Sequence, residues 1–408
     1  MLLARLLKHL IRRGTLVVHD ASGKTWTFGD GQEPRAAIRL HDRALHTLIA
    51  LRPSLYVGEA WMNGTLTVEG CSLYDFLELA TSNIEAAPKD LLANFRLHSA
   101  LWVRRLRQYN PVPRSKRNVA HHYDLSDRLY ELFLDKDRQY SCAYFKNGDD
   151  DLEAAQQNKK THIAAKLLLK PGQRVLDIGS GWGGLALYLA ASADVEVTGL
   201  TLSEEQHRVA NERARRAGLD GRVKFLLRDY REEVGRYDRI VSVGMFEHVG
   251  VVHYPDYFKQ LRNLLADDGV ALIHSIGRFD GPASTNPWLR KYIFPGGYSP
   301  ALSEVMPVVE QTGLFVTDIE ILRLHYAVTL RHWRARFEQH REEIRQIYDD
   351  RFCRMWEFYL VGSELAFRNQ GHMVFQMQIS RQLESVPLTR DYMFDWERTQ
   401  GQRRDIAA

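Results

Sequence analysis

A glycine-rich turn between two apolar segments constrains the fold of this chain more than any other feature. Residues 175–184 read VLDIGSGWGG, a short apolar strand that runs into four glycines, and the apolar segment LALYLAA follows. Glycine lets the backbone turn tightly without a Cβ clash, so a flat ligand can lie against the turn above the carboxyl end of the strand. The pattern by itself fits a dinucleotide, S-adenosylmethionine or no ligand at all.

Strand-like and helical segments alternate from about residue 160 to 278. The expected strands are 174–179, 195–201, 223–229, 239–244 and 269–277. The expected helices are 185–191, 204–218 and 257–267. This alternation predicts an α/β fold with a parallel sheet covered on both faces, in which ligands bind outside the carboxyl ends of the strands.

The 408 residues exceed a typical single domain, so we expect additions to this sheet. Residues 1–110 mix short strands and helices and predict a small α+β domain. Residues 111–121 are the expected linker, since Pro111 and Pro113 forbid a continuous helix. Residues 122–400 are the expected catalytic domain.

The last part of that domain continues the pattern. A helix is expected at 303–313, a strand at 315–323, one long helical run over 327–370 and a final strand at 372–381.

The first 13 residues predict an amphipathic helix. Five apolar residues share one helical face: Leu3, Leu6, Leu7, Leu10 and Ile11. Arginines and lysines lie opposite them, and a second basic cluster without acids spans 101–118. The helix either lies on an anionic membrane surface or packs on its own domain, and the sequence leaves both open.

Composition excludes some classes of protein. A net charge of +4 is too small to indicate a nucleic-acid partner, and no apolar run is long enough to cross a bilayer. The three cysteines, Cys71, Cys142 and Cys353, lie far apart without metal-type spacing, which favours reduced thiols in a cytoplasmic protein and no metal site.

The end of the second strand argues against a dinucleotide. Dinucleotide-binding units usually carry Asp or Glu there to bind the ribose hydroxyls, and this chain has Thr201. Ser203 and Gln206 fit a capping box at the start of the next helix, which leaves Gln206 able to touch a ligand as well.

Seven motifs in the same order make the chain resemble the cyclopropane fatty acid synthase family of S-adenosylmethionine-dependent methyltransferases, which includes the mycolic acid cyclopropane synthases. The matching segments are 122–145, 175–184, 199–206, 242–250, 274–277, 293–300 and 325–333. The segment GEAWMNG near the N-terminus is similar to the appended domain of the longer, phospholipid-acting members. The resemblance implies a Rossmann-like methyltransferase fold with a seven-stranded, mostly parallel sheet.

The resemblance also implies which residues hold S-adenosylmethionine. They are Tyr140, Ser141, Asp177, Gly179, Gly181, Thr201, Gln206, Tyr230 and Arg231. The Tyr-Arg pair at 230–231, expected near the adenine, departs from the Trp-Glu pair of some mycobacterial relatives.

The family reaction adds a methylene across a cis double bond of an acyl chain, through a carbocation that loses a proton as the ring closes. The resemblance implies that a bound bicarbonate ion takes this proton. The positions that match its site are Cys142, Glu247, His274, Ile276 and Tyr326. Glu247 beside an anion is unfavourable unless one of the two carries a proton, and the sequence does not assign that proton.

Other interpretations of these residues remain. Without the family, Cys142 would be a candidate thiolate nucleophile paired with His274. Aromatic rings can stabilise a carbocation, and the candidates near the motifs are Tyr140, Tyr144, Phe145, Tyr292, Phe294 and Tyr298, about half of which we expect to be ordinary core packing.

For partners, the resemblance implies unsaturated phospholipid acyl chains, a homodimer and a cytoplasmic protein attached peripherally to the inner membrane. The alternatives are a fatty acyl C-methyltransferase that makes methyl- or methylene-branched chains, a non-catalytic lipid- or S-adenosylmethionine-binding protein, and a nucleic-acid methyltransferase. The last is disfavoured because the chain has no Asn-Pro-Pro-Tyr-type motif.

Overall fold

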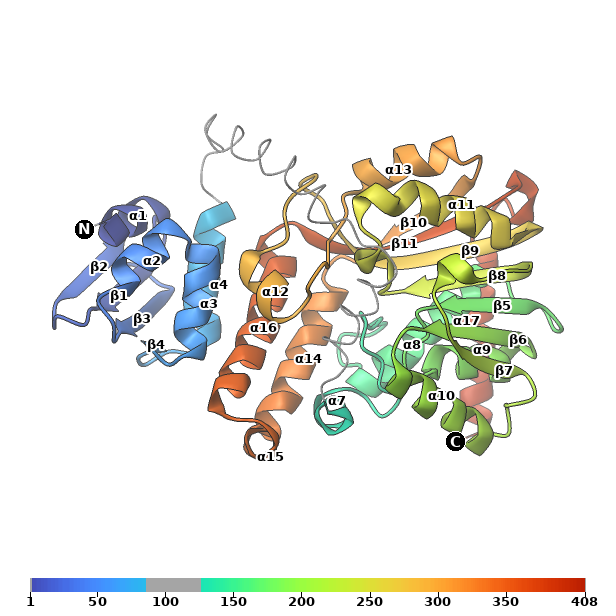
Figure 1. Ribbon diagram of the computed structural model, residues 1–408, viewed down its shortest axis with the longest axis horizontal. Coiled ribbons are helices and arrows are strands. Elements are labelled where there is room, and N and C mark those ends of the chain that lie inside the picture. The colour runs from blue at the N-terminus through green and yellow to red at the C-terminus, as the bar shows by residue number, and fades with distance from the viewer. Residues whose placement is uncertain (1, 86–125, 408) are drawn as a thin grey trace. The chain divides into compact units, whose positions relative to one another are not determined.

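The computed structural model describes residues 2–85 and 126–407, which form two compact units (Figure 1). Among these residues, unit 1 comprises 2–85, 284–295 and 327–372, and unit 2 comprises 126–283, 296–326 and 373–407.

This division differs from the boundaries expected from the sequence. Residues 284–295 and 327–372 pack with the N-terminal residues, although both segments fall inside the expected catalytic domain of 122–400. The expected linker at 111–121 and the basic cluster at 101–118 lie outside the described residues.

Unit 2 is built on a seven-stranded sheet with the strand order β10-β11-β9-β8-β5-β6-β7. Its strands are β5 (Arg174–Ile178), β6 (Glu196–Thr201), β7 (Val223–Leu227), β8 (Tyr237–Val243), β9 (Leu265–Arg278), β10 (Phe315–Ile321) and β11 (His372–Ser380). The five strands β5 to β9 pair in parallel, whereas β10 and β11 are antiparallel to each other. The mostly parallel sheet confirms the predicted α/β fold.

Helices cover both faces of this sheet (Figure 1). One face packs against α8 (Leu152–Leu167), α9 (Gly184–Ala193) and α10 (Glu204–Arg216), and the other against α11 (Tyr254–Leu264) and α13 (Leu302–Gln311). Neighbouring residues of a strand serve opposite faces, so Val175 joins the first core and Leu176 the second.

Two further helices belong to unit 2. They are α7 (Asp127–Phe133) and the C-terminal α17 (Asp391–Ala407), which packs on α8. The sequence analysis predicted neither α7, α8 nor α17.

Unit 1 contains a four-stranded sheet with the order β2-β1-β3-β4. Its strands are β1 (Thr15–His19), β2 (Thr25–Gly29), β3 (Arg35–Leu40) and β4 (Leu66–Val68). Its helices are α1 (Leu2–Leu10), α2 (Leu45–Leu51), α3 (Pro53–Met62), α4 (Leu73–Glu85), α12 (Pro287–Tyr292), α15 (Arg341–Ile347), α16 (Asp350–Asn369) and, from residue 327 on, α14 (His325–Gln339).

The N-terminal helix α1 packs on its own unit. Leu3, Leu7 and Ile11 are buried in the core of unit 1, while Leu6 and Leu10 are partly buried against it. The apolar face is therefore covered by protein, and the basic side chains opposite remain exposed. Among the residues that the structure describes, none of the helices combines the length and apolar character that a bilayer crossing requires.

The long helical run expected over 327–370 is three helices, α14, α15 and α16, so that prediction was wrong in its continuity. The last break has a local cause, because the Asp349 carboxylate accepts a hydrogen bond from the Phe352 N–H at 2.6 Å and caps α16.

Candidate active site

The glycine turn joins β5 to α9 at the carboxyl edge of the unit 2 sheet. The Gly179 N–H donates to the Leu200 carbonyl oxygen on β6 at 3.0 Å, and Gly179 adopts a left-handed φ of +86°. A Cβ at this position would lie 2.9 Å from Met245 Cβ. Only glycine satisfies both conditions, so the turn stays open above the strand.

A cavity of roughly 860 Å³, including its open mouth, lies beside this turn. Its apolar walls come from the ends of β5, β6 and β8 and the segments that follow them, and they include Ile178, Leu200, Val243, Met245 and Val249. Six of the nine residues expected to hold the cofactor line it: Gly179, Gly181, Thr201, Gln206, Tyr230 and Arg231. Apolar walls with a few polar groups are typical of a small-molecule binding site.

The corner between β6 and α10 supplies hydroxyl and amide groups to this cavity. The Gln206 N–H donates to Ser203 Oγ at 3.3 Å, which is the first half of the expected capping box. The second half is absent, because Gln206 Oε1 instead accepts from the Thr201 hydroxyl at 2.9 Å. Gln206 is therefore held toward Thr201 rather than toward the cap.

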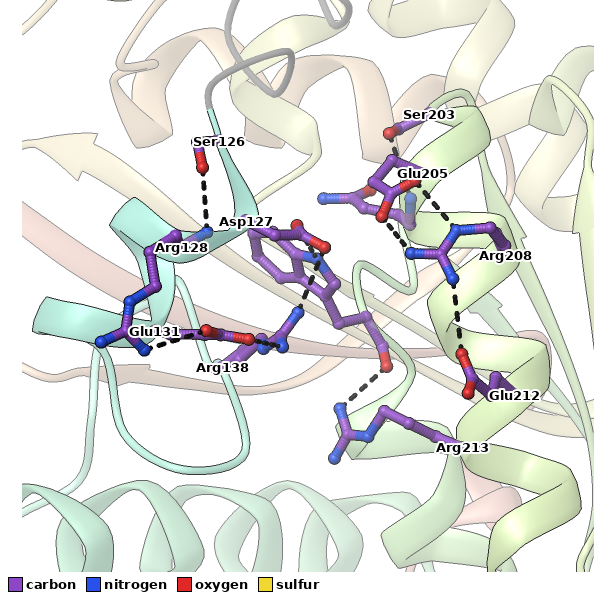
Figure 2. Close-up of polar contacts among 12 residues, drawn as sticks. Ser126, Asp127, Arg128, Glu131, Arg138, Ser203, Glu205, Arg208, Glu212 and Arg213 are labelled. Carbon is purple, nitrogen blue, oxygen red and sulfur yellow. Dashed lines mark hydrogen bonds and ion pairs between the residues drawn. The ribbon is translucent and has the colours of Figure 1, made fainter. Parts of the chain in front are cut away.

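Charged side chains tie α7 and the loop after it together and brace the start of α10 (Figure 2). Arg138 pairs with Asp127 at 3.5 Å and with Glu131, and Arg208 pairs with Glu205 on α10. The Trp182 indole N–H, from the glycine turn, donates to Asp127 Oδ1 at 3.4 Å. The contact between Trp182 and Asp127 holds α7 against the glycine turn.

Asp229 lines the cavity and was missed by the sequence analysis. Its carboxylate accepts from Arg231 Nε at 2.8 Å and from an Arg231 Nη atom at 2.7 Å. Arg231 is thus anchored to Asp229 in a bidentate pair, and its guanidinium also lies 5.6 Å from the Tyr230 ring centroid.

Ser141 does not line the cavity but binds a buried cation. Lys159 of α8 is completely buried, and its Nζ donates to Ser141 Oγ at 2.8 Å and to Gln139 Oε1 at 2.7 Å. Burial lowers the pKa of Lys159 to about 8. Nothing in the sequence marked Lys159, since its partners lie about 20 residues away.

Asp177, another expected cofactor residue, is buried at the end of β5. Burial raises the pKa of its carboxyl to about 7, and the nearby Lys159 opposes that rise. In the described part of the chain Asp177 Oδ2 has no hydrogen-bond partner. A buried acceptor of this kind costs free energy unless a ligand donor satisfies it.

Tyr140 is the remaining expected cofactor residue outside the cavity lining. Its ring packs edge-on against Tyr130 and Phe133 of α7, with centroid distances of 5.5 and 6.1 Å.

Glu247 and Ile276, two of the five residues expected at the anion site, contact each other directly. The Ile276 N–H donates to Glu247 Oε1 at 2.7 Å, and burial raises the pKa of Glu247 to about 7. The second oxygen, Oε2, is buried and lacks a partner among the described residues.

His274 is buried on β9 and keeps a neutral ring. Burial and the positive charges of Lys159 and Lys166 hold its pKa well below the ordinary value. Its Nδ1 lies 3.1 Å from the side-chain Nε2 of Gln376 on β11, another residue that the sequence analysis missed.

The segments that carry Cys142 and Tyr326 meet through their neighbours. The Phe145 N–H donates to His325 Nδ1 at 3.1 Å, and the Tyr144 ring stacks on His325 at 4.9 Å. Cys142 is buried, and its thiol donates to the Ala143 carbonyl at 3.3 Å. The structure therefore brings these two segments together beside α8, and the roles of the five expected residues stay predictions.

Three of the candidate cation-stabilising aromatics have other partners. Tyr292 and Phe294 belong to unit 1, where Tyr292 donates to Glu59 at 2.9 Å and Phe294 packs edge-on against Tyr359. Tyr298 of unit 2 is buried and donates to Glu304 at 2.5 Å.

Comparisons with known proteins agree with this geometry. Residues 112–377 match the family described as mycolic acid cyclopropane synthetase, and residues 2–90 match a domain of unknown function (DUF7884). The chain is 38% identical to a cyclopropane-fatty-acyl-phospholipid synthase of Escherichia coli K12 over 87% of this chain and 90% of the relative.

A probable fatty acid methyltransferase of Pseudomonas putida is 40% identical over 68% of this chain and 73% of the relative. Among solved structures, the mycolic acid cyclopropane synthase CmaA1 in complex with SAH and CTAB superposes with a TM-score of 0.62 and 32% identity, covering 67% of this chain and 99% of that one.

Proposed function

Because the chain belongs to the mycolic acid cyclopropane synthetase family, we propose that it converts cis double bonds of phospholipid acyl chains into cyclopropane rings, with the added carbon taken from S-adenosylmethionine. The observation that carries this proposal is the likeness to a cyclopropane-fatty-acyl-phospholipid synthase, which spans most of both chains. When bound, S-adenosylmethionine supplies a methyl group on a sulfonium, which the π electrons of a double bond attack to leave a carbocation on the acyl chain.

The cavity beside the glycine turn is the proposed place of this cofactor. Thr201 and Gln206 present polar groups, and Ile178 and Met245 present apolar surface for the flat base. The unpartnered Asp177 Oδ2 supports a role as acceptor for a positively charged amino group. Ser141, fixed by Lys159, is proposed to orient the same end of the ligand.

A bicarbonate ion is proposed to accept the proton that leaves as the ring closes. The groups proposed to hold it are those of Cys142, Glu247, His274, Ile276 and Tyr326. A pKa near 7 leaves Glu247 about half protonated at neutral pH, and because Oε1 already accepts from Ile276, Oε2 is the oxygen proposed to carry the proton when the anion is bound. Oε2 then donates to the anion, which removes the repulsion that a carboxylate would cause.

Access to phospholipid is proposed to rest on electrostatic attraction. With most of the apolar side of α1 buried, the charges offered to an anionic surface are Arg5 and Lys8 of α1 and Arg12 and Arg13 just after it. We propose peripheral attachment at the inner membrane and a homodimer as the working assembly, both of which follow from the family resemblance.

Branched-chain synthesis is the second candidate function. The likeness to a probable fatty acid methyltransferase favours it, since a 1,2-hydride shift moves the charge of the same carbocation to the methyl-bearing carbon, and loss of a methyl proton then leaves a methylene branch.

The test uses the purified full chain, S-adenosylmethionine and vesicles of phosphatidylglycerol and phosphatidylethanolamine with cis-unsaturated chains. S-adenosylhomocysteine release is measured, and the extracted lipids are examined by proton NMR. Upfield cyclopropane signals are the expected result, and vinyl signals of a methylene branch would replace the first function by the second. Absence of any lipid product would overturn both.

A further inference from the structure

Gln376 is a polar side chain in the most buried strand of unit 2. Strand β11 lies between β9 and β10, and every residue of it after His372 is buried. An amide in such a place costs free energy unless its groups are paired. The Gln376 Nε2 is paired with His274 Nδ1 at 3.1 Å, while Oε1 has no partner within the described residues.

The contact belongs to a polar layer between the sheet and α8. Alternation along β11 places Gln376 and Gln378 on the face opposite Phe375, which packs with the α11 side of the core. Gln378 contacts the carbonyl oxygen of Lys166 on α8 at 2.6 Å, and Lys159 of the same helix acts electrostatically on His274. Gln376 and His274 therefore meet on the α8 side of the sheet.

The chemistry of the pair selects one form of the imidazole. An amide nitrogen can only donate, so Nδ1 of His274 must accept and cannot carry a proton. The ring is neutral, because burial and the neighbouring Lys159, Lys166 and His162 outweigh the opposing charge of Glu320. A neutral ring with a bare Nδ1 carries its proton on Nε2.

We propose that Gln376 is a positioning residue that fixes His274 in the Nε2–H tautomer, so that the ring presents a hydrogen-bond donor to the reaction site. This inference rests on the proposed function, in which that donor binds the anion that accepts the reaction's proton.

The experiment measures the tautomer directly by ¹⁵N NMR of histidine-labelled protein, alongside S-adenosylhomocysteine release from unsaturated vesicles. In the wild type the Nε2–H form is expected. Gln376→Leu removes the amide donor to Nδ1, so Nδ1 is free to carry the proton and the Nδ1–H form should appear. We expect kcat to fall about 10- to 100-fold while S-adenosylmethionine affinity stays within about 2-fold.

Gln378→Leu is the matched control, since Gln378 is equally buried two residues along the same face of β11 but contacts Lys166 and Tyr392 instead. It should leave the His274 tautomer and kcat unchanged, even where the melting temperature falls.

Two results would overturn the inference: a wild-type ring with its proton on Nδ1, or a Gln376→Leu protein that keeps both the Nε2–H form and its kcat. A wild type that shows the Nε2–H form but releases no S-adenosylhomocysteine would instead overturn the proposed function.

Discussion

Glu247 carries its two carboxyl oxygens in different surroundings. Oε1 accepts the Ile276 N–H, while Oε2 is buried without a partner among the described residues. A raised pKa follows from this burial, since an ionised carboxylate there would lack solvation. The protonated side chain is therefore the form best suited to face an anion.

Replacement of Glu247 should reveal this protonation. Because its pKa is raised to about 7, the protonated form is lost as the pH climbs through 7, and wild-type kcat should decline on that side at fixed bicarbonate concentration. Glu247→Gln keeps a donor that cannot ionise, so it should retain more activity than Glu247→Ala and lose this decline. An unchanged alkaline limb in Glu247→Gln would contradict the assignment.

Lys159 provides a second prediction for a single residue. Lys159→Met removes the charged donor to Ser141 and Gln139, a kind of hydrogen bond worth about 1.5–3 kcal/mol. We expect S-adenosylmethionine affinity, measured by calorimetry, to fall roughly 10- to 100-fold. The exposed Lys170, three residues after α8, is the control, and Lys170→Met should bind normally. If both variants bound S-adenosylmethionine with the same affinity, Lys159 would have no role in binding the cofactor.

Helix α17 illustrates how one element is fastened to another through buried charge. His162 of α8 lies between Glu397 of α17 and Glu320 of β10, with its two ring nitrogens 2.6 Å from their oxygens. Both nitrogens must donate, so the ring is an imidazolium. Tyr144 stacks on it at 4.2 Å, which links this fastening to the segment that carries Cys142.

Removal of that cation should loosen α17. His162→Ala removes the partner that Glu320 and Glu397 share and leaves each with one lysine, Lys166 and Lys146, so we expect about 2–3 kcal/mol of destabilisation in urea titration, at or below the low end for a buried pair. His253→Ala, which breaks a pair with the largely exposed Asp256, should cost less than about 1 kcal/mol. If both variants lost the same free energy of unfolding, His162 would not be a special contact between α8 and α17.

Elements with a strong local signal were predictable, and nonlocal ones were not. The strands around Val175 and Val241 and the glycine turn follow from apolar runs and backbone requirements that the sequence displays. The break before α16 depends on one capping aspartate inside a helical pattern, and α17 has a mostly polar sequence whose docking depends on His162, more than 200 residues away. Gln376 was hidden because strand patterns identify buried positions but not their partners.

At the scale of the whole molecule, the chain passes back and forth between its two units. Unit 1 takes residues 284–295 and 327–372 from the middle of the chain segment that forms unit 2. The match to the mycolic acid cyclopropane synthetase family, over residues 112–377, therefore covers parts of both units. The match to the domain of unknown function, DUF7884, is confined to residues 2–90.

Membrane attachment is a property of the whole molecule, because it depends on the sum of the charges over a surface. With the apolar side of α1 buried, binding to anionic vesicles should be weakened by salt. Replacing Arg5, Lys8 and Arg12 by Gln should weaken the free energy of vesicle binding, measured by co-sedimentation, by about 1 kcal/mol per side chain. The same replacement at the exposed Lys136, Lys224 and Lys259 of unit 2 removes equal charge and should have little effect. If both triple variants lost the same amount of vesicle binding, the attraction would depend on net charge and not on the N-terminal residues.

The place of β11 in the sheet also bears on synthesis of the protein. This strand follows every other strand of the sheet in the sequence, yet it lies between β9 and β10 and supplies the partner of His274. During translation the earlier strands can assemble as they emerge, but β9 lacks this neighbour until β11 itself has been made. Chains that stop early would carry every family motif and still be inert.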